Sequence, residues 1–197
     1  MKQTDRNIKD IEAKISRNNV LLFDMDGTLV HTNLANFKSY KKAIKKVTQF
    51  EIDLTLVPNR RFNRTVLRKV LPNLNETEYE KIIQEKEHCF KEFLHETKLN
   101  KKITEILFEY CKTNRTVLVT NCRKDRALTI LDHYGLINSF DDIFYRYNGD
   151  NKNVNKYKKA IAKLNISPDS IIVFENEIPE KNDAIKAGIN RNNILNL

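Results

Sequence analysis

Several short, largely apolar runs in this chain end abruptly in polar residues. The runs and the residues that follow them are Val20–Phe23 with Asp24, Thr116–Val119 with Thr120 and Asn121, and Ile171–Phe174 with Glu175 and Asn176. A continuous apolar run of this length is typical of a strand buried on both faces of a parallel sheet. Ligands of such sheets bind at the carboxyl ends of the strands. The pattern therefore predicts that polar side chains from three strands share one ligand-binding edge.

The segments between these runs show helical spacing of their apolar residues. This spacing predicts helices at about residues 125–134, 154–164 and 182–187, and a glycine follows the first and the last of them. Strands that alternate with helices indicate an α/β fold with a doubly wound, Rossmann-like parallel sheet. A further amphipathic helix is expected at residues 4–17, where three isoleucines recur at helical spacing.

The region from residue 32 to residue 98 interrupts this alternation. It carries three apolar stripes at helical spacing and one weak candidate strand at Ile52–Val57. Asn75 and Glu78 form a capping-box pattern at the start of the third stripe. We therefore expect a helical domain at residues 32–98, inserted into an α/β core of residues 1–31 and 99–197. Residues 1–19 are a helical extension of that core.

Composition limits the class of protein. Among the 197 residues, 40% are hydrophobic and 31% are charged, as in ordinary soluble proteins. No stretch approaches the roughly 18 apolar residues of a membrane span, and residues 1–19 mix charged residues with isoleucine without the apolar core of a secretory signal. Three scattered cysteines fit a reducing compartment, so we expect a cytoplasmic protein. The net charge of +9 indicates either an anionic partner or a general lysine bias, and the bias is the preferred reading.

The segment Asp24-Met25-Asp26-Gly27-Thr28 follows the first predicted strand. Alternate residues of an extended chain point in opposite directions, so both carboxylates face one site only if the chain turns at Gly27. One carboxylate could then attack a phosphorus atom while the other transfers a proton. A hard divalent cation such as Mg²⁺ would offset their repulsion of a phosphate. Taken alone, the segment is equally compatible with a simple turn at a strand end.

Three segments together resemble the haloacid dehalogenase superfamily. They are Asp24-Met25-Asp26-Gly27-Thr28-Leu29, Val117-Leu118-Val119-Thr120-Asn121, and Phe174-Glu175-Asn176-Glu177 with the helix Ala184–Ile189. They resemble the first, second and fourth signatures of that superfamily, in its order, over residues 20–197. The helical insertion is similar to the cap of the phosphoglycolate phosphatase and β-phosphoglucomutase subgroup. The resemblance implies a phosphoryl-transfer enzyme, a phosphoric monoester hydrolase.

The resemblance also implies roles for the matching residues. Asp24 would be the nucleophile that forms an aspartyl-phosphate, and it would bind Mg²⁺ as well. Asp26 would be the general acid and base, with its main-chain carbonyl on the metal. The Thr120 hydroxyl, together with Asn121 and nearby backbone amides, would hold the phosphoryl oxygens.

Two features of the family pattern are altered in this chain. A lysine is expected before the helix at 154–164; Lys152 is the preferred residue and Lys156 is the alternative, because the usual Lys-Pro start is absent. Glu175 and Asn176 complete the expected metal site, but the family usually has an aspartate at the position of Asn176. An amide offers Mg²⁺ an oxygen without a charge, so we expect weaker metal binding rather than inactivity.

The predicted cap carries Arg60, Arg61 and Arg64, which could clamp an anionic group of the substrate. The alternative is a solvated helix face, favoured for at least two of the three. The expected function is a magnesium-dependent phosphatase of a small organic phosphate. A phosphomutase, a phosphatase of nucleic-acid ends and a non-catalytic binding protein remain alternatives. We expect a small phosphorylated molecule as partner ahead of nucleic acid, no membrane partner, and a monomer or homodimer.

Overall fold

The computed structural model describes residues 11–51, 54, 61–146 and 154–196, and the chain divides into two compact units. Unit 1 comprises residues 1–30 and 99–197, and unit 2 comprises residues 31–98. Of the candidate strand at Ile52–Val57 only Leu54 is described, and it does not lie in a strand. The helix expected at 4–17 is described only from Ile11, and there residues 11–12 are helical while residues 13–17 are not. Each unit is described separately below.

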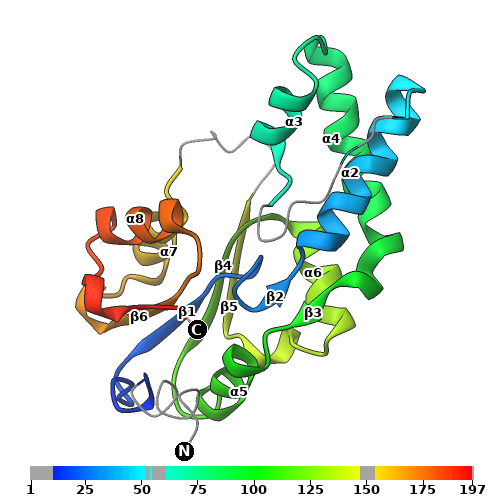
Figure 1. Cartoon of the computed structure of the whole chain (residues 1–197). Helices are drawn as coiled ribbons and strands as arrows, with labels where there is room; N and C mark the ends of the chain where they lie inside the picture. Colours follow the sequence, from blue (N-terminus) through cyan, green and yellow to red (C-terminus); the bar gives the residue numbers. More distant parts are fainter. Residues whose placement is uncertain (1–10, 52–53, 55–60, 147–153, 197) are drawn as a thin grey trace, which may run out of the picture. The chain divides into compact units, whose positions relative to one another are not determined.

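Unit 1 is built on a parallel sheet with strand order β5-β4-β1-β6-β7 (Figure 1). The strands are β1 (Val20–Phe23), β4 (Thr116–Arg123), β5 (Asp142–Arg146), β6 (Ile171–Phe174) and β7 (Ile194–Leu195). The predicted α/β class with a doubly wound parallel sheet is confirmed. The three strands predicted from apolar runs are the three central ones. The two flanking strands did not stand out in the sequence: β5 is only half-buried, and β7 has two residues.

Four helices connect the strands of unit 1. They are α5 (Lys101–Tyr110), α6 (Lys124–His133), α7 (Lys156–Leu164) and α8 (Ile178–Lys186), with short 3₁₀ turns at Ile137–Ser139, Pro168–Ser170 and Arg191–Asn193. In Figure 1, α7 and α8 lie on one side of the sheet, and α5 and α6 lie on the other. Helix α8 begins four residues before the predicted helix 182–187, because Pro179 is compatible with a first helical turn.

The core under α7 and α8 explains why the strands read as continuous apolar runs. Leu22, Val117 and Val173 from the three central strands are fully buried against Tyr157 and Ala160 of α7. On the other face, the rings of Phe23 and Phe174 stack with their centroids 4.7 Å apart. Both faces are therefore covered, and the polar residues that follow each strand lie at its carboxyl end.

Unit 2 is helical. Its elements are α2 (Asn33–Thr48), α3 (Arg64–Val70) and α4 (Glu76–Phe90), and a 3₁₀ segment at Lys91–Glu96 follows α4. Helices α2 and α4 pack through an apolar cluster, and ion pairs flank their contact: Lys38 with Glu96, Lys42 with Glu92, and Lys46 with Glu85. The predicted Asn75–Glu78 capping box is present. Strands β2 (Val30–His31) and β3 (Lys98–Leu99), where the chain enters and leaves unit 2, pair with each other.

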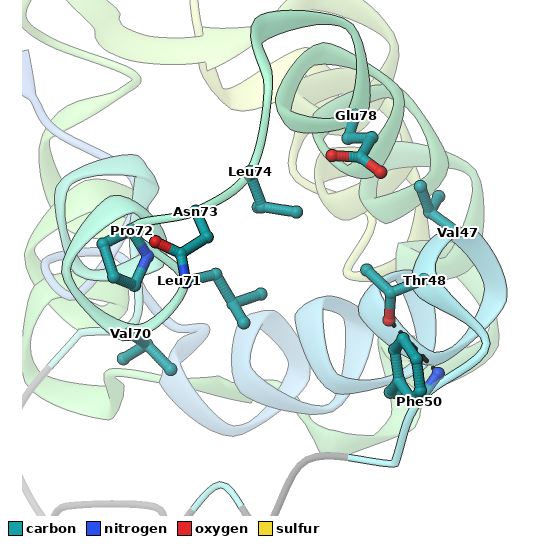
Figure 2. A pocket seen from close by; sticks show the side chains of 9 residues that line it. All are labelled: Val47, Thr48, Phe50, Val70, Leu71, Pro72, Asn73, Leu74 and Glu78. Atoms are coloured by element: carbon teal, nitrogen blue, oxygen red, sulfur yellow. Dashed lines mark hydrogen bonds between the residues drawn. The ribbon is translucent and has the colours of Figure 1, made fainter.

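A cavity of about 490 Å³ opens in unit 2 between the ends of its helices (Figure 2). Its lining is largely apolar: Val47, Thr48, Phe50, Val70, Leu71, Pro72, Asn73, Leu74 and Glu78. The Glu78 carboxylate accepts a hydrogen bond from the Asn75 backbone N–H as part of the helix cap. Of the residues that the structure describes, no lysine, arginine or histidine lines this cavity, so the lining offers no cation to bind a phosphate. Within the described residues, no helix is both long and apolar enough to cross a membrane.

Candidate active site

The residues predicted to carry the chemistry meet at the carboxyl edge of the sheet in unit 1. Asp24 follows β1, Thr120 lies in β4, and Glu175 follows β6. The adjacent strands are in register, and the Asp24 backbone N–H donates to the Phe174 carbonyl at 3.0 Å. All three side chains are buried; 6% of Asp24, 3% of Thr120 and 1% of Glu175 is exposed. Buried carboxylates require partners, which the neighbouring elements supply.

Lys156 is the central partner. Its ammonium donates to Asp24 Oδ1 at 2.7 Å and to Glu175 Oε2 at 2.9 Å, and it lies 3.2 Å from Glu180 Oε2. Lys156 is the first residue of α7, whose N-cap, Asn155, accepts hydrogen bonds from the backbone of the first turn. The Asn155 amide also donates to the Asp183 carbonyl at 2.6 Å, which ties the start of α7 to α8. The backbone at the start of α7 is therefore fixed, and with it the position from which the Lys156 side chain reaches Asp24.

The electrostatics of the pair follow from its burial. Desolvation raises the pKa of Asp24 to about 7, with Glu175 and Asp26 adding to the rise and Lys156 opposing it. Burial alone would lower the pKa of Lys156, but the surrounding Asp24, Tyr157 and Glu175 raise it well above its ordinary value. Lys156 therefore stays charged, and its single charge lies between the carboxylates of Asp24 and Glu175. A further cation would be favoured at this edge.

Glu175 is held by three donors. Its Oε2 accepts from Lys156 and from the Tyr157 hydroxyl at 2.8 Å, and its Oε1 accepts from the Glu177 backbone N–H at 2.9 Å. Burial raises the pKa of Tyr157 well above its ordinary range, so the phenol remains a donor. The sequence indicated only that Tyr157 lies on an apolar helix face. Its ring does lie in the core, but its hydroxyl reaches the site.

The first and fourth sequence segments interlock. The Thr28 hydroxyl donates to Asn176 Oδ1 at 3.0 Å and accepts from the Asn176 backbone N–H at 3.2 Å. Gly27 has φ +87°, and a Cβ at this position would lie 2.8 Å from Asn176 Nδ2. Glycine is thus required twice, for the turn that the sequence predicted and for the close approach of Asn176.

Arg126, from the first turn of α6, pairs with the second carboxylate of the first segment. Its Nη2 donates to Asp26 Oδ2 at 3.1 Å, and both side chains are buried. Its Nε donates to the sulfur of Cys122. Nothing in the sequence singled out Arg126, because its contact joins the first turn of α6 to the segment after β1, 100 residues earlier in the chain.

Thr120 and Asn121 have different surroundings. The Thr120 hydroxyl accepts from the Cys122 backbone N–H at 3.1 Å, which closes the loop around it. The exposed Asn121 amide donates to Glu180 Oε1 at 2.9 Å. Glu180 lies in the first turn of α8, four residues after Asn176, and it was not identified from the sequence. It brings a fourth carboxylate to this edge.

Known proteins with the same organisation identify the family. A model of the haloacid dehalogenase-like hydrolases matches residues 21–194. The chain belongs to this family. A curated relative from Thermotoga maritima, named phosphorylated carbohydrates phosphatase, is 29% identical over 188 residues, covering 87% of this chain and 82% of the relative. The predicted family and enzyme class are therefore confirmed.

Solved structures support the same fold. A putative β-phosphoglucomutase from Thermotoga maritima is 25% identical with a TM-score of 0.61, and the match covers 89% of this chain and 83% of that one. A predicted phosphoglycolate phosphatase from Haemophilus somnus 129PT is 18% identical with a TM-score of 0.71, and the match covers 89% of this chain and 84% of that one. A hydrolase of the family from Entamoeba histolytica is 21% identical with a TM-score of 0.71, covering 91% and 83%.

Of the two candidate lysines, Lys152 and Lys156, the structure describes only Lys156. Lys152 lies outside the described residues, whereas Lys156, the alternative, contacts Asp24 directly. The preference for Lys152 followed the distance from Glu175 along the chain. That distance does not account for the reach of a lysine side chain from the first turn of α7. The Asn155 N-cap, which fixes where α7 starts, is the sequence signal that favours Lys156.

Members of this family generally use Mg²⁺. Within the described residues, no group of three or more His, Cys, Asp and Glu side chains has the arrangement of a metal site. However, Asp24 Oδ2 has no hydrogen-bond donor among the described residues, and Asn176 Oδ1 accepts only one hydrogen bond there. Carboxylate and amide oxygens are ligands that Mg²⁺ accepts. These oxygens fit Mg²⁺, with less charge than an aspartate at position 176 would give.

The arginines expected to contact substrate lie in unit 2. Arg60 is outside the described residues, while Arg61 and Arg64 are both half-buried. Arg64 is the first residue of α3, and its carbonyl accepts from the Tyr79 hydroxyl at 3.2 Å. Neither arginine is a fully solvated residue on an exposed helix face.

Proposed function

We propose that this hydrolase is a magnesium-dependent phosphatase of a small phosphorylated carbohydrate or similar organic phosphate, and that Asp24 is its nucleophile. The observation that carries the proposal is the buried Lys156 ammonium between Asp24 and Glu175. A buried cation against the attacking carboxylate lowers the repulsion between that carboxylate and a phosphate dianion. The name of the Thermotoga maritima relative supports a phosphorylated carbohydrate as substrate.

The reaction has two steps in this proposal. An Asp24 oxygen attacks phosphorus while the bond from phosphorus to the leaving oxygen breaks, and Asp26 gives its proton to that oxygen. Asp26 then takes a proton from water, whose oxygen attacks the aspartyl-phosphate and releases phosphate and free Asp24. Thr120, with nearby backbone amides and Asn121, holds the nonbridging oxygens, and Lys156 takes the role first expected of Lys152.

The proposed metal ligands are Asp24, the main-chain carbonyl of Asp26, and Asn176. When bound, Mg²⁺ neutralises phosphate charge and orients its oxygens. Glu175 contributes its negative charge, while its own oxygens hold Lys156 and Tyr157. For the cap, we propose that Arg60, Arg61 and Arg64 bind an anionic group of the substrate. Replacement of Arg61 or Arg64 by alanine should then raise KM with little change in kcat.

The decisive experiment is hydrolysis of p-nitrophenyl phosphate and of a panel of sugar phosphates with Mg²⁺ or with a chelator. Asp24→Asn should reduce kcat by roughly 10⁶-fold, as loss of the nucleophile does in a serine protease. Asp142→Asn is the matched control, since Asp142 begins β5 and pairs with Arg115. Release of inorganic phosphate supports a phosphatase, whereas an isomeric sugar phosphate indicates a mutase. Asp24→Asn enzyme with wild-type activity would contradict the nucleophile assignment.

A further inference from the structure

We propose that Arg126 is a positioning residue that fixes the Asp26 carboxylate for both proton transfers. This inference rests on the proposed function, because it concerns how the general acid and base of that reaction is held. Arg126 is the third residue of α6, and its guanidinium joins Asp26 to Cys122, in the strand that carries Thr120.

The contact is specific and shielded from water. Arg126 Nη2 lies 3.1 Å from Asp26 Oδ2, and the exposed fractions of the side chains are 9% and 4%. The Nε of the same guanidinium donates to Cys122, whose backbone N–H donates to the Thr120 hydroxyl at 3.1 Å. One planar group thus connects the proposed acid and base with the residue proposed to hold the phosphoryl oxygens. A planar guanidinium fixes direction as well as distance.

The position of Asp26 makes such a support necessary. Asp26 precedes Gly27, where the chain turns with φ +87°, and its carboxylate is two residues from the nucleophile. An aspartate has two side-chain torsions, and proton transfer requires the carboxyl within hydrogen-bond reach of the reacting oxygen. A misplacement of about 1 Å is enough to reduce rates by roughly 100-fold. Arg126 restricts the torsions of Asp26 from the opposite loop.

Both half-reactions depend on the placement of Asp26. In the first, the proton moves from Asp26 to the leaving oxygen as that oxygen separates from phosphorus. In the second, the proton moves from water to Asp26 as the water oxygen bonds to phosphorus and the aspartyl-phosphate bond breaks. A nitrophenolate leaves without a proton, but an alkoxide does not. Loss of positioning should therefore slow the first half-reaction of an alkyl phosphate more than that of an aryl phosphate. The second half-reaction should be slowed equally for both substrates.

The test compares wild type, Arg126→Met and Arg126→Lys with p-nitrophenyl phosphate and with an alkyl sugar phosphate. For Arg126→Met, kcat/KM for the alkyl substrate should fall about 100-fold, a typical contribution of acid–base catalysis. With p-nitrophenyl phosphate, kcat/KM should stay within about threefold while kcat falls, because only the second half-reaction then needs Asp26. A rapid burst of nitrophenol, near one per active site, should precede slow turnover. For Arg126→Lys, kcat/KM for the alkyl substrate should lie between the values for wild type and Arg126→Met. If Arg126→Met does not fold, the comparison of Arg126→Lys with wild type still tests the proposal.

Arg115→Met is the control. Arg115 donates two hydrogen bonds to Asp142 at 3.0 and 2.7 Å, so it is a second arginine–aspartate pair, but at the start of β4 rather than at the site. It should keep the wild-type ratio of alkyl to aryl kcat/KM. Equal losses for both substrates in the Arg126 variants, or no loss, would overturn the positioning role. Failure of the proposed function is distinguishable from these outcomes. It would appear as hydrolysis by the Asp24→Asn variant at the wild-type rate.

Discussion

Replacement of Lys156 by methionine tests the central ion pair most directly. Methionine preserves the length of the side chain but removes the ammonium that lies 2.7 Å from Asp24, 2.9 Å from Glu175 and 3.2 Å from Glu180. All of these contacts are lost at once, and Asp24 and Glu175 remain buried. The expected consequences concern both the free energy of unfolding and catalysis.

The magnitude follows from burial. Removal of one partner from a buried ion pair costs about 3–5 kcal/mol, because the other charge is left without compensation. Here Glu175 keeps the Tyr157 hydroxyl and the Glu177 N–H, which places the expected loss near the lower end, at about 3 kcal/mol. Unfolding in urea, followed by circular dichroism, measures this loss. Phosphatase activity should fall by at least about 100-fold, since the ammonium then no longer offsets the repulsion between the nucleophile and the phosphate.

Lys158→Met is the matched control, because Lys158 lies two residues further along the same helix and is exposed. Its free energy of unfolding should change by no more than about 0.5 kcal/mol. A Lys156→Met protein that is as stable and as active as the Lys158→Met protein would refute the reasoning. In that case another lysine, such as Lys152, would have to supply the charge.

Three further outcomes are expected. Asn176→Asp should lower the Mg²⁺ concentration for half-maximal activity by about tenfold, because it adds a charged oxygen ligand. Titrations of activity and of thermal stability with Mg²⁺ measure this concentration. An unchanged midpoint would place the metal elsewhere. Tyr157→Phe leaves buried Glu175 without its hydroxyl donor and should destabilise the protein by about 1–3 kcal/mol in urea unfolding, whereas no change would show that the hydrogen bond is dispensable. Gly27→Ala should cost about 1–3 kcal/mol and reduce activity, because the turn has φ +87° and the new Cβ meets Asn176; wild-type activity and stability would contradict that requirement.

The residues that follow buried strands could be predicted, because each depends on a local pattern. Asp24, Thr120 and Glu175 each lie in or directly after an apolar run, and parallel strands bring such positions to one edge whatever the rest of the chain does. Strand β5 was missed because its half-buried residues, Asp142–Arg146, mix charged and aromatic side chains. The family resemblance added roles, but it could not choose the lysine.

Arg126 and Glu180, which the sequence missed, share a physical reason with Lys156, which it ranked second. Lys156, Arg126 and Glu180 lie in the first turns of α7, α6 and α8, and each reaches the site with a long side chain. Their contacts span 132 residues for Lys156 with Asp24 and 100 residues for Arg126 with Asp26, so no local pattern reports them. Three helices that follow parallel strands begin at the same edge of the sheet. Long polar residues in their first turns are therefore candidates for the site even where no motif identifies them.

Glu180 also changes how Asn176 is interpreted. From the sequence, an amide in place of the family's aspartate removes one negative charge from the site. The structure supplies a carboxylate four residues later, 3.2 Å from the Lys156 ammonium and 2.9 Å from the Asn121 amide. Glu180 lies in the first turn of α8, which begins two residues after Asn176. Among the described residues, this edge holds the carboxylates of Asp24, Asp26, Glu175 and Glu180, and the cations Lys156 and Arg126 pair with them. We therefore expect Asn176 to weaken Mg²⁺ binding without abolishing it, because the carboxylates still attract a divalent cation.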